Sequence, residues 1–266
     1  MKITSLVLFG IISIALFSCD NTTDNNDPTN PVENKDKDST KAIAPIDNPE
    51  KVSDQSPVYG IDISKYQGDE MDLLNKSEDS LSFVICRSSQ GITYTDPNFS
   101  KNWKEIKEKG FIRGAYHFYM SDDSPEQQAE HFLSLISDLE ATDFPPVIDF
   151  EELSIAEGSD KEQVIEDLWT FIFLIEEKSG RKPIIYTDVN IGNSYLTASR
   201  FANYTLWIAN YTSAESPTMP GAWKGMDWTL WQKTDDYHFE NIQNDFDLFN
   251  GDLDDLKKSI SGSNTK

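Results

Sequence analysis

The stretch Phe144-Pro145-Pro146-Val147-Ile148-Asp149-Phe150-Glu151-Glu152 decides the fold. Two prolines before a short apolar run predict a strand that begins abruptly and is buried on at least one face. Side chains alternate along a strand, so Asp149 and Glu151 share a face, with their carboxylates roughly 6 to 7 Å apart. A buried charge needs a partner or must lose its ionisation, so such a pair suits acid/base hydrolysis of a glycosidic bond. Taken alone, the pair is explained more simply by a strand that runs into a solvated acidic loop.

The rest of the chain predicts further strands, because short apolar or alternating segments recur along it. These strands are expected over residues 58–64, 81–88, 112–119, 182–188, 205–211, 228–234 and 245–249. Helices are expected over residues 98–110, 124–139, 160–180 and 190–203. Short strands mostly separated by helices predict an α/β fold in which a parallel sheet closes into a single TIM-like (β/α) barrel. Helix signals are poor between the last three strands, so we expect an irregular barrel with an incomplete helical ring.

The amino terminus, residues 1–19, has the pattern of a signal peptide. Lys2 precedes an apolar run from Leu6 to Phe17 that is too short to span a bilayer comfortably. The sequence Leu16-Phe17-Ser18-Cys19 resembles a bacterial lipoprotein box, although its phenylalanine departs from the usual small residue. The resemblance implies that Cys19 becomes the lipidated first residue of a protein anchored in the cell envelope, periplasmic or surface-exposed. An ordinary secretory signal with an incidental cysteine is the alternative.

Residues 20–57 contain nine acidic residues and four lysines but hardly any large apolar side chains. Such a segment cannot bury enough surface to offset its ordering entropy, so we expect a disordered acidic tether. The hydrolase barrel is expected over residues 58–259 and a disordered tail over 260–266. The formal net charge of −23 argues against nucleic acid or an anionic membrane surface as a partner. A lipid anchor is thus the one expected membrane contact, and we expect a monomer.

Acidic side chains also occupy the first and last strands, and in (β/α) barrels the chemistry lies at the carboxyl ends of the strands. Like charges raise one another's free energy, so four acids that converge on one mouth indicate a catalytic site: Asp62, Asp149, Glu151 and Asp245. Flat aromatic rings on the strands suit the apolar faces of sugars, although core packing explains any one of them: Tyr116, Tyr186, Trp207, Tyr211 and Trp231. The three histidines show no ligand spacing, so neither a metal nor a cofactor is expected, and His117 is expected to be a hydrogen-bonded core residue.

A series of segments matches a known family in order and spacing. They are Tyr59–Gly68, Phe83–Gly91, Arg113–Phe118, Pro146–Glu151, Ile184–Thr187, Leu206–Ala209, Leu230–Gln232 and Asp245–Gly251. Through them, residues 58–256 resemble the glycoside hydrolase family 25 lysozymes, the Chalaropsis-type or cellosyl-like muramidases. The resemblance implies an irregular barrel that cleaves the β-1,4 bond between N-acetylmuramic acid and N-acetylglucosamine in the glycan strand of peptidoglycan.

The resemblance also implies roles for individual residues. Glu151 takes the place of the general acid. One of the other acids, Asp149, Asp62 or Asp245, would stabilise the cationic intermediate or orient the acetamido group of the substrate. Substrate contacts are expected from Tyr116, Tyr186, Trp207, Tyr211 and Gln232. Attack by a carboxylate, by that acetamido group or by water stays open.

Two other functions are conceivable for a barrel with these acids. A chitinase-like family 18 barrel needs acids where this chain has Phe144 and Val147, so it is excluded. A barrel that binds cell-wall glycan without cleaving it remains the alternative from another class.

One residue departs from the family pattern. The last strand reads Asp245-Phe246-Asp247, where the family usually has Asp-x-Asn. Two interpretations of Asp247 stay open: a solvated charge on the rim, or a charge that holds Glu151 protonated towards neutral pH.

Overall fold

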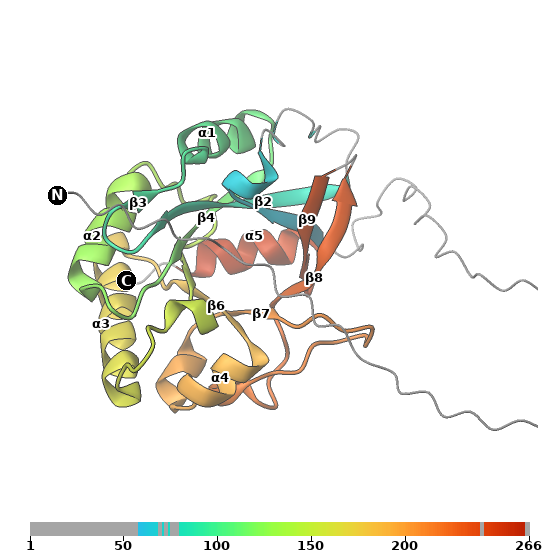
Figure 1. Ribbon diagram of the computed structural model, residues 1–266. Helices are drawn as coiled ribbons and strands as arrows, with labels where there is room; N and C mark the ends of the chain where they lie inside the picture. The colour runs from blue at the N-terminus through green and yellow to red at the C-terminus, as the bar shows by residue number, and fades with distance from the viewer. Residues whose placement is uncertain (1–57, 69–70, 72–73, 75–79, 240–241, 264–266) are drawn as a thin grey trace, which may run out of the picture. The chain divides into compact units, whose positions relative to one another are not determined.

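The computed structural model describes residues 58–68, 71, 74, 80–239 and 242–263, so the expected signal peptide and tether lie outside the described residues. Eight strands close into a barrel in the order β1, β2, β4, β5, β6, β7, β8, β9 and back to β1 (Figure 1). Their bounds are β1 Val58–Ile63, β2 Leu81–Gln90, β4 Ile112–Phe118, β5 Val147–Asp149, β6 Ile184–Asp188, β7 Leu206–Ala209, β8 Leu230–Phe239 and β9 Ile242–Phe249. The short β3 (Tyr94–Thr95) folds back on the end of β2. The closed barrel confirms the predicted fold class.

The last strand differs from the expected parallel sheet. β9 is antiparallel to both of its neighbours, β8 and β1, whereas the other adjacent pairs in the barrel are parallel. Only residues 240 and 241 separate β8 from β9, and a parallel crossover needs a dozen or more. The hairpin brings the amino half of β9 to the mouth where the parallel strands end. Asp245 of β9 consequently lies directly opposite Asp62 of β1.

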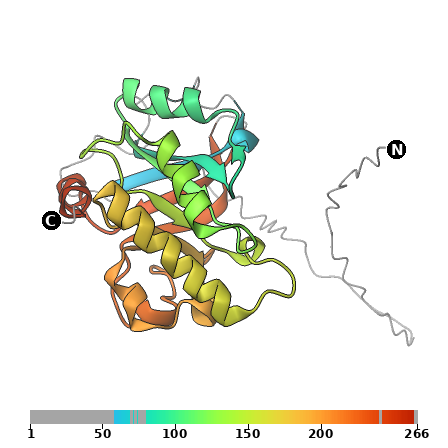
Figure 2. The same ribbon diagram turned by 90° about the vertical axis from the view of Figure 1, so that its left-hand side faces the viewer.

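Helices cover part of the outside of the barrel. They are α1 Phe99–Glu108, α2 Pro125–Leu135, α3 Lys161–Ser179, α4 Val189–Tyr195 and α5 Leu253–Gly262. Figure 2 shows α2 and α3 side by side, with α1 above them. Between β7 and β8, the described residues contain no α-helix but only the 3₁₀-helix η5 Gly221–Trp223. The ring of helices is therefore incomplete, as the sequence predicts.

One helix has its predicted limits, and two others end earlier than predicted. α3 begins after Asp160, whose side chain accepts from the Gln163 N–H at 2.9 Å, and it is terminated by Gly180 with φ 67°, as expected. α2 ends at Leu135, before the expected residue 139. The helix expected over 190–203 is interrupted at Leu196, whose carbonyl accepts from the Ala222 N–H, and it resumes as the 3₁₀-helix η4 Ser199–Asn203. A tertiary contact here overrides the local helix signal.

Apolar side chains form one layer between barrel and helices and another inside the barrel. The outer layer includes the α3 residues Val164, Leu168, Phe171, Ile172 and Ile175. The inner layer includes Val58, Phe83, Ile85, Val147, Ile184, Trp207, Leu230 and Phe249. Inside, the strands leave so little space that a Cβ on Gly60 would lie 2.1 Å from the Phe83 ring. The interior is thus packed, and open space remains at the mouth.

The helix α5 closes the amino end of the barrel (Figure 1). Its buried Leu256 and Ile260 pack against the inner layer, beside Phe144 and Ile184. The expected boundary at residue 259 therefore falls inside a helix, and residues 260–262 belong to the barrel domain. Three apolar residues of this helix, Leu253, Leu256 and Ile260, recur at helical spacing, a signal that was present in the sequence but was not used to predict a helix.

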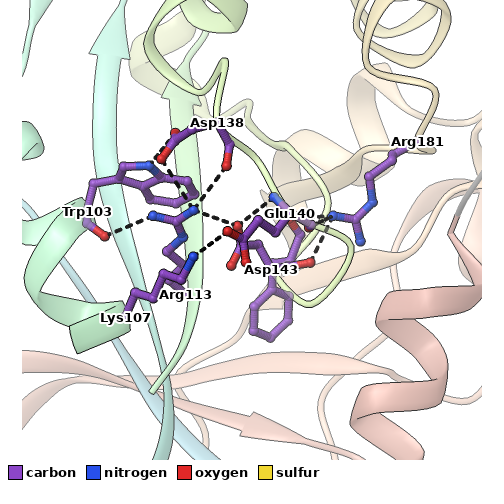
Figure 3. Close-up of polar contacts among 8 residues, drawn as sticks. Trp103, Lys107, Arg113, Asp138, Glu140, Asp143 and Arg181 are labelled. Atoms are coloured by element: carbon purple, nitrogen blue, oxygen red, sulfur yellow. Dashed lines mark hydrogen bonds and ion pairs between the residues drawn. The ribbon is translucent and has the colours of Figure 1, made fainter. Parts of the chain in front are cut away.

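Two buried arginines connect the loops at this amino end through hydrogen bonds and an ion pair (Figure 3). Arg113 forms an ion pair with Asp143 at 2.9 Å and lies 3.8 Å from the centre of the Trp103 ring. Arg181 donates to the carbonyls of Asp143 at 2.9 Å and of Ile260, in α5, at 2.9 Å. We call the labelled residues of Figure 3 the amino-end network: Trp103, Lys107, Arg113, Asp138, Glu140, Asp143 and Arg181.

Candidate active site

A pocket of about 310 Å³ opens at the carboxyl ends of the parallel strands. It brings together nine of the ten residues expected from the sequence: Asp62, Tyr116, Asp149, Glu151, Tyr186, Trp207, Tyr211, Gln232 and Asp245. The tenth, Trp231, is instead buried in the outer layer, where its Nε1 donates to the Asn210 carbonyl at 2.8 Å. A larger cavity of about 620 Å³ lies beside the ends of α2 and α3, but no aromatic ring lines it and its Arg181 is bonded to backbone carbonyls. The pocket at the mouth is therefore the candidate active site. Cys19, the expected lipidation residue, lies outside the described residues.

The strand β5 places its two acids as the alternation predicts, although it is shorter than expected. β5 ends at Asp149, and the next residue, Phe150, is fully buried and stacks edge-on against Tyr119 and Tyr195 outside the barrel. The Phe150 N–H donates to the Tyr186 carbonyl at 3.0 Å, which continues the pairing with β6 past the end of the strand. Asp149 and Glu151 consequently both reach the pocket.

Gln232 of β8 holds Asp62 in position. Its Nε2 donates to Asp62 Oδ2 at 2.6 Å. Its Oε1 accepts from the hydroxyls of Tyr186 at 2.8 Å and of Tyr211 at 2.7 Å. Two hydroxyl donors on the same oxygen orient the amide so that its nitrogen faces the carboxylate. Sequence reasoning expected Gln232 and the tyrosines as substrate contacts, and the structure shows that they also form one hydrogen-bonded unit.

The aspartates of the pocket retain protons more tightly than exposed aspartates do. Burial is the main cause for Asp62, whose pKa is raised well above its usual range, with Asp245 and Asp247 adding to it. Burial and then Glu151 likewise raise the pKa of Asp149. Burial raises the pKa of Asp245 to about 6. Such a site can hold protonated and ionised carboxyls together near neutral pH, which acid/base catalysis requires.

Glu151 has its own charged surroundings. Burial raises its pKa, the nearby Asp188 raises it further, and the guanidinium of Arg87 opposes both. Asp188 ends β6, and its Oδ1 accepts from the N–H groups of Asn190 at 2.6 Å and Ile191 at 3.1 Å, so its carboxylate is fixed in place. Among the neighbouring acids, Asp188 raises the pKa of Glu151 most, and Glu152 adds a smaller effect in the same direction.

Asp247 is not a rim charge, so that interpretation is wrong. The residue is 0% exposed, its Oδ1 accepts from Trp207 Nε1 at 2.9 Å, and its Oδ2 is buried without a partner among the described residues. Its negative charge raises the pKa of Asp62, whereas Asp188 has that effect on Glu151. Asp247 is thus a deep acid beneath the mouth.

His117 lies outside the pocket, as expected. Its fully buried ring packs against Phe132 and Phe171, and its Nδ1 is 2.8 Å from Ser89 Oγ. Burial lowers its pKa to about 3. A neutral ring at this place is a core residue.

Sequence reasoning missed several residues of the pocket: Ser64, Tyr66, Gln67, Arg87, Phe118 and Asp235. Arg87 had a usable signal, because it follows the inward-facing Phe83 and Ile85 by alternation and lies near the carboxyl end of β2. Asp235 had none, because its place depends on the unexpected hairpin of β8 and β9.

Comparisons with known proteins agree with this geometry. Residues 61–242 match the family described as glycosyl hydrolases family 25. The chain is 30% identical over 211 residues to the protein YegX of Escherichia coli K12, which covers 77% of this chain and 74% of that protein. It is 28% identical over 220 residues to the N,O-diacetylmuramidase of Chalaropsis sp., covering 77% of this chain and 100% of that protein. The solved structure of a family GH25 lysozyme from Aspergillus fumigatus matches with a TM-score of 0.68 at 27% identity, covering 78% of this chain and 100% of that chain. Because the family match spans more than half of the sequence, this chain belongs to glycosyl hydrolases family 25.

Proposed function

We propose that this protein is a peptidoglycan hydrolase, a lysozyme that cleaves the β-1,4 bond between N-acetylmuramic acid and N-acetylglucosamine. The observation that carries the proposal is the pocket in which Asp149 and Glu151 face two further acids and a set of aromatic rings. Paired carboxyls with raised pKa values are the groups that glycosidic hydrolysis uses. Similar proteins named lysozyme or muramidase support the same reaction.

Glu151 is the general acid of the proposed reaction. Because its pKa is raised by burial and by Asp188, its carboxyl keeps a proton at a pH where a free glutamate has lost it. The proton passes to the glycosidic oxygen as the bond from that oxygen to the anomeric carbon breaks. One of the acids Asp149, Asp62 and Asp245 stabilises the positive charge on the sugar or orients its acetamido group. The stereochemistry of the product identifies the attacking group.

The glycan strand is bound by the aromatic wall of the pocket. Tyr211 is 52% exposed at the mouth and offers a flat face to a sugar ring, whereas Trp207 lies deeper, edge-on to Tyr186. The Gln232 amide accepts from the hydroxyls of Tyr186 and Tyr211 and donates to Asp62, so it fixes the positions of these three groups relative to one another. Tyr116 completes the lining of the pocket.

The substitution Glu151→Gln tests the proposal. The amide cannot donate a proton to the leaving oxygen, so turnover on purified peptidoglycan should fall by at least about 100-fold while the fold is kept. The matched control is Glu152→Gln, which neutralises an exposed acid on the next residue and should leave turnover within about two-fold of wild type.

Two measurements complete the test. Mass analysis of the released muropeptides should find N-acetylmuramic acid at the new reducing ends, since those ends identify the cleaved bond. Clearing of wall suspensions by Glu151→Gln at the wild-type rate would refute the assignment of the general acid. Binding to peptidoglycan without any cleavage by the wild-type protein would establish the alternative, a non-catalytic glycan-binding barrel.

We further propose that the protein is anchored in the cell envelope by a lipid on Cys19. The short apolar run ending in Ser18-Cys19 supports this anchor. Within the described residues, no helix has the length and hydropathy to cross a membrane. The substitution Cys19→Ala should move the protein from the detergent phase to the aqueous phase with unchanged specific activity, because the polar segment 20–57 separates anchor and barrel. Unchanged detergent partition in this variant would contradict a lipid on Cys19.

A further inference from the structure

Among the residues that line the active-site pocket, Arg87 is the one cation. It belongs to β2, is 9% exposed, and shares the pocket with five acids: Asp62, Asp149, Glu151, Asp235 and Asp245. Nothing in the proposed proton transfer uses it. The buried positive charge of Arg87 therefore has no role in the reaction described so far.

Two aromatic rings and one hydrogen bond position the Arg87 guanidinium. It lies between two rings, 5.4 Å from the centre of Tyr94 and 5.1 Å from that of Phe118, and its NH2 group donates to Gln90 Oε1 at 2.5 Å. Tyr94 reaches it because the turn at Gly91, with φ 54°, folds β3 back on β2. The short strand β3, which the sequence did not predict, thus forms one side of a clamp on the arginine.

No carboxylate in the described part of the chain neutralises this cation directly. Arg87 forms no ion pair there, and its Nε is buried without a hydrogen-bond partner. Its charge instead acts across the pocket and opposes the effect of burial on both Asp149 and Glu151. The charged and titratable groups around Arg87 and the Asp149–Glu151 pair come from several elements: Asp62 of β1, Lys65 and Tyr66 of η1 (Lys65–Gln67), Tyr94 of β3, Tyr116 and His117 of β4, Asp149 and Glu151 at β5, Tyr186 and Asp188 of β6, Tyr211 after β7, Asp235 of β8 and Asp245 of β9.

We propose that Arg87 is a positioning residue whose fixed positive charge sets the pH window in which the Asp149–Glu151 pair carries a single proton. Acid/base cleavage of a glycosidic bond requires that state, with one carboxyl protonated and the other ionised. Two neighbouring carboxyls lose their protons in two steps that belong to the pair, and a nearby cation moves both steps to lower pH. This inference rests on the proposed glycosidase function.

The test compares the pH dependence of kcat/KM for wild type, Arg87→Gln and Arg87→Lys on peptide-free glycan fragments. Without the positive charge, both steps of the pair occur at higher pH. The acid limb and the basic limb of the Arg87→Gln profile should therefore move together to higher pH, by about one unit. Arg87→Lys keeps the charge and should restore most of the wild-type profile.

Two results would assign Arg87 another role. If the kcat/KM profile of Arg87→Gln has a lower maximum but limbs at the same pH as wild type, Arg87 is only a structural residue and the proposal is overturned. A raised KM with unmoved limbs would make it a substrate contact and overturn it too. Lys233→Met, which removes a charge over the Trp231 ring at 4.9 Å and away from the pocket, is the control for net charge and should not move either limb.

If Arg87→Gln does not fold, Gln90→Leu supplies the test. It removes the acceptor of the 2.5 Å hydrogen bond but keeps the arginine, so the loosened charge should give a smaller shift in the same direction. No shift in this folded variant would also count against the proposal. A failure of the glycosidase assignment is distinguishable, because the wild-type protein would then bind peptidoglycan without cleaving it.

Discussion

The two ends of the barrel differ in whether their buried charged groups are paired. At the amino end, Arg113 and Asp143 are 3% and 5% exposed and pair at 2.9 Å (Figure 3). At the mouth, the buried carboxyls of Asp62, Asp149 and Asp247 have no cation in contact within the described residues, and oxygens of Asp149 and Asp247 lack any hydrogen-bond partner there. One end pairs its buried charges, although Arg113 Nε lacks a hydrogen-bond partner among the described residues, and the other end leaves its buried carboxyls without a cation.

This difference separates structural from functional charge. A paired buried ion contributes to a unique arrangement of the loops, and its removal leaves the partner uncompensated. Unpaired buried acids respond by retaining protons, which costs stability above their unfolded-state pKa values but yields groups that can donate protons. The mouth therefore has a chemical capacity that the amino end lacks.

The largest effect is expected from breaking the pair at the amino end. Arg113→Met leaves Asp143 buried without its cation and should lower the free energy of unfolding by about 3 to 5 kcal/mol in urea titrations near neutral pH. Lys107→Met is the control, because the Lys107–Glu140 pair of the same network is exposed and should contribute about 1 kcal/mol or less. A loss below about 1 kcal/mol for Arg113→Met would remove the contrast between the two ends.

Most of the barrel was predictable because its strands are short apolar runs bounded by helix signals. The direction of β9 was not, since the strand pattern is the same in either direction and only the two-residue connection to β8 decides it. The direction of β9 is thus decided by tertiary contacts rather than by local periodicity. The helix α5 is a different case, because Leu253, Leu256 and Ile260 recur at helical spacing behind the N-cap Asp252, and this local signal was overlooked.

The acids and aromatic rings of the site were predictable because strand alternation orients each of them towards one mouth. Alternation also applies to Arg87, but a single cation gives no chemical reason to select it until its acidic neighbours are placed. The burial of Asp247 was not predictable, because both interpretations put it on the same face of the strand. Its depth follows from the register of β9, which sets it opposite Gly60 and Gln232.

A smaller effect on stability is expected from Asp247→Asn, which removes one of the unpaired buried carboxyls at the mouth. The asparagine keeps an acceptor for Trp207 Nε1 and removes the ionisable group. Burial, followed by Asp245, raises the pKa of Asp247 well above its unfolded-state value. An acid whose folded-state pKa is raised stabilises the fold fully below its unfolded-state pKa, and that stability is lost as the pH rises towards the folded-state value. The wild-type protein therefore loses stability as the pH rises, whereas the asparagine variant, which has no ionisable group at this position, does not lose it through residue 247.

The stability difference between the two proteins should therefore depend on pH in a defined direction. Near about pH 4 the variant should be equal to wild type or slightly less stable, because its amide replaces a neutral carboxyl. Near about pH 8 it should be more stable by about 1 to 3 kcal/mol, the usual cost of an unsatisfied buried polar group. Thermal unfolding across this range measures the difference. The raised pKa of Asp149 affects both proteins and largely cancels in the comparison. The pKa of Asp62 is lower in the variant, because Asp247 helps to raise it, and this change adds to the difference in the same direction. A difference that does not change with pH would mean that Asp247 is ionised in the folded protein, and the mouth would then contain a compensated charge like those of the amino end.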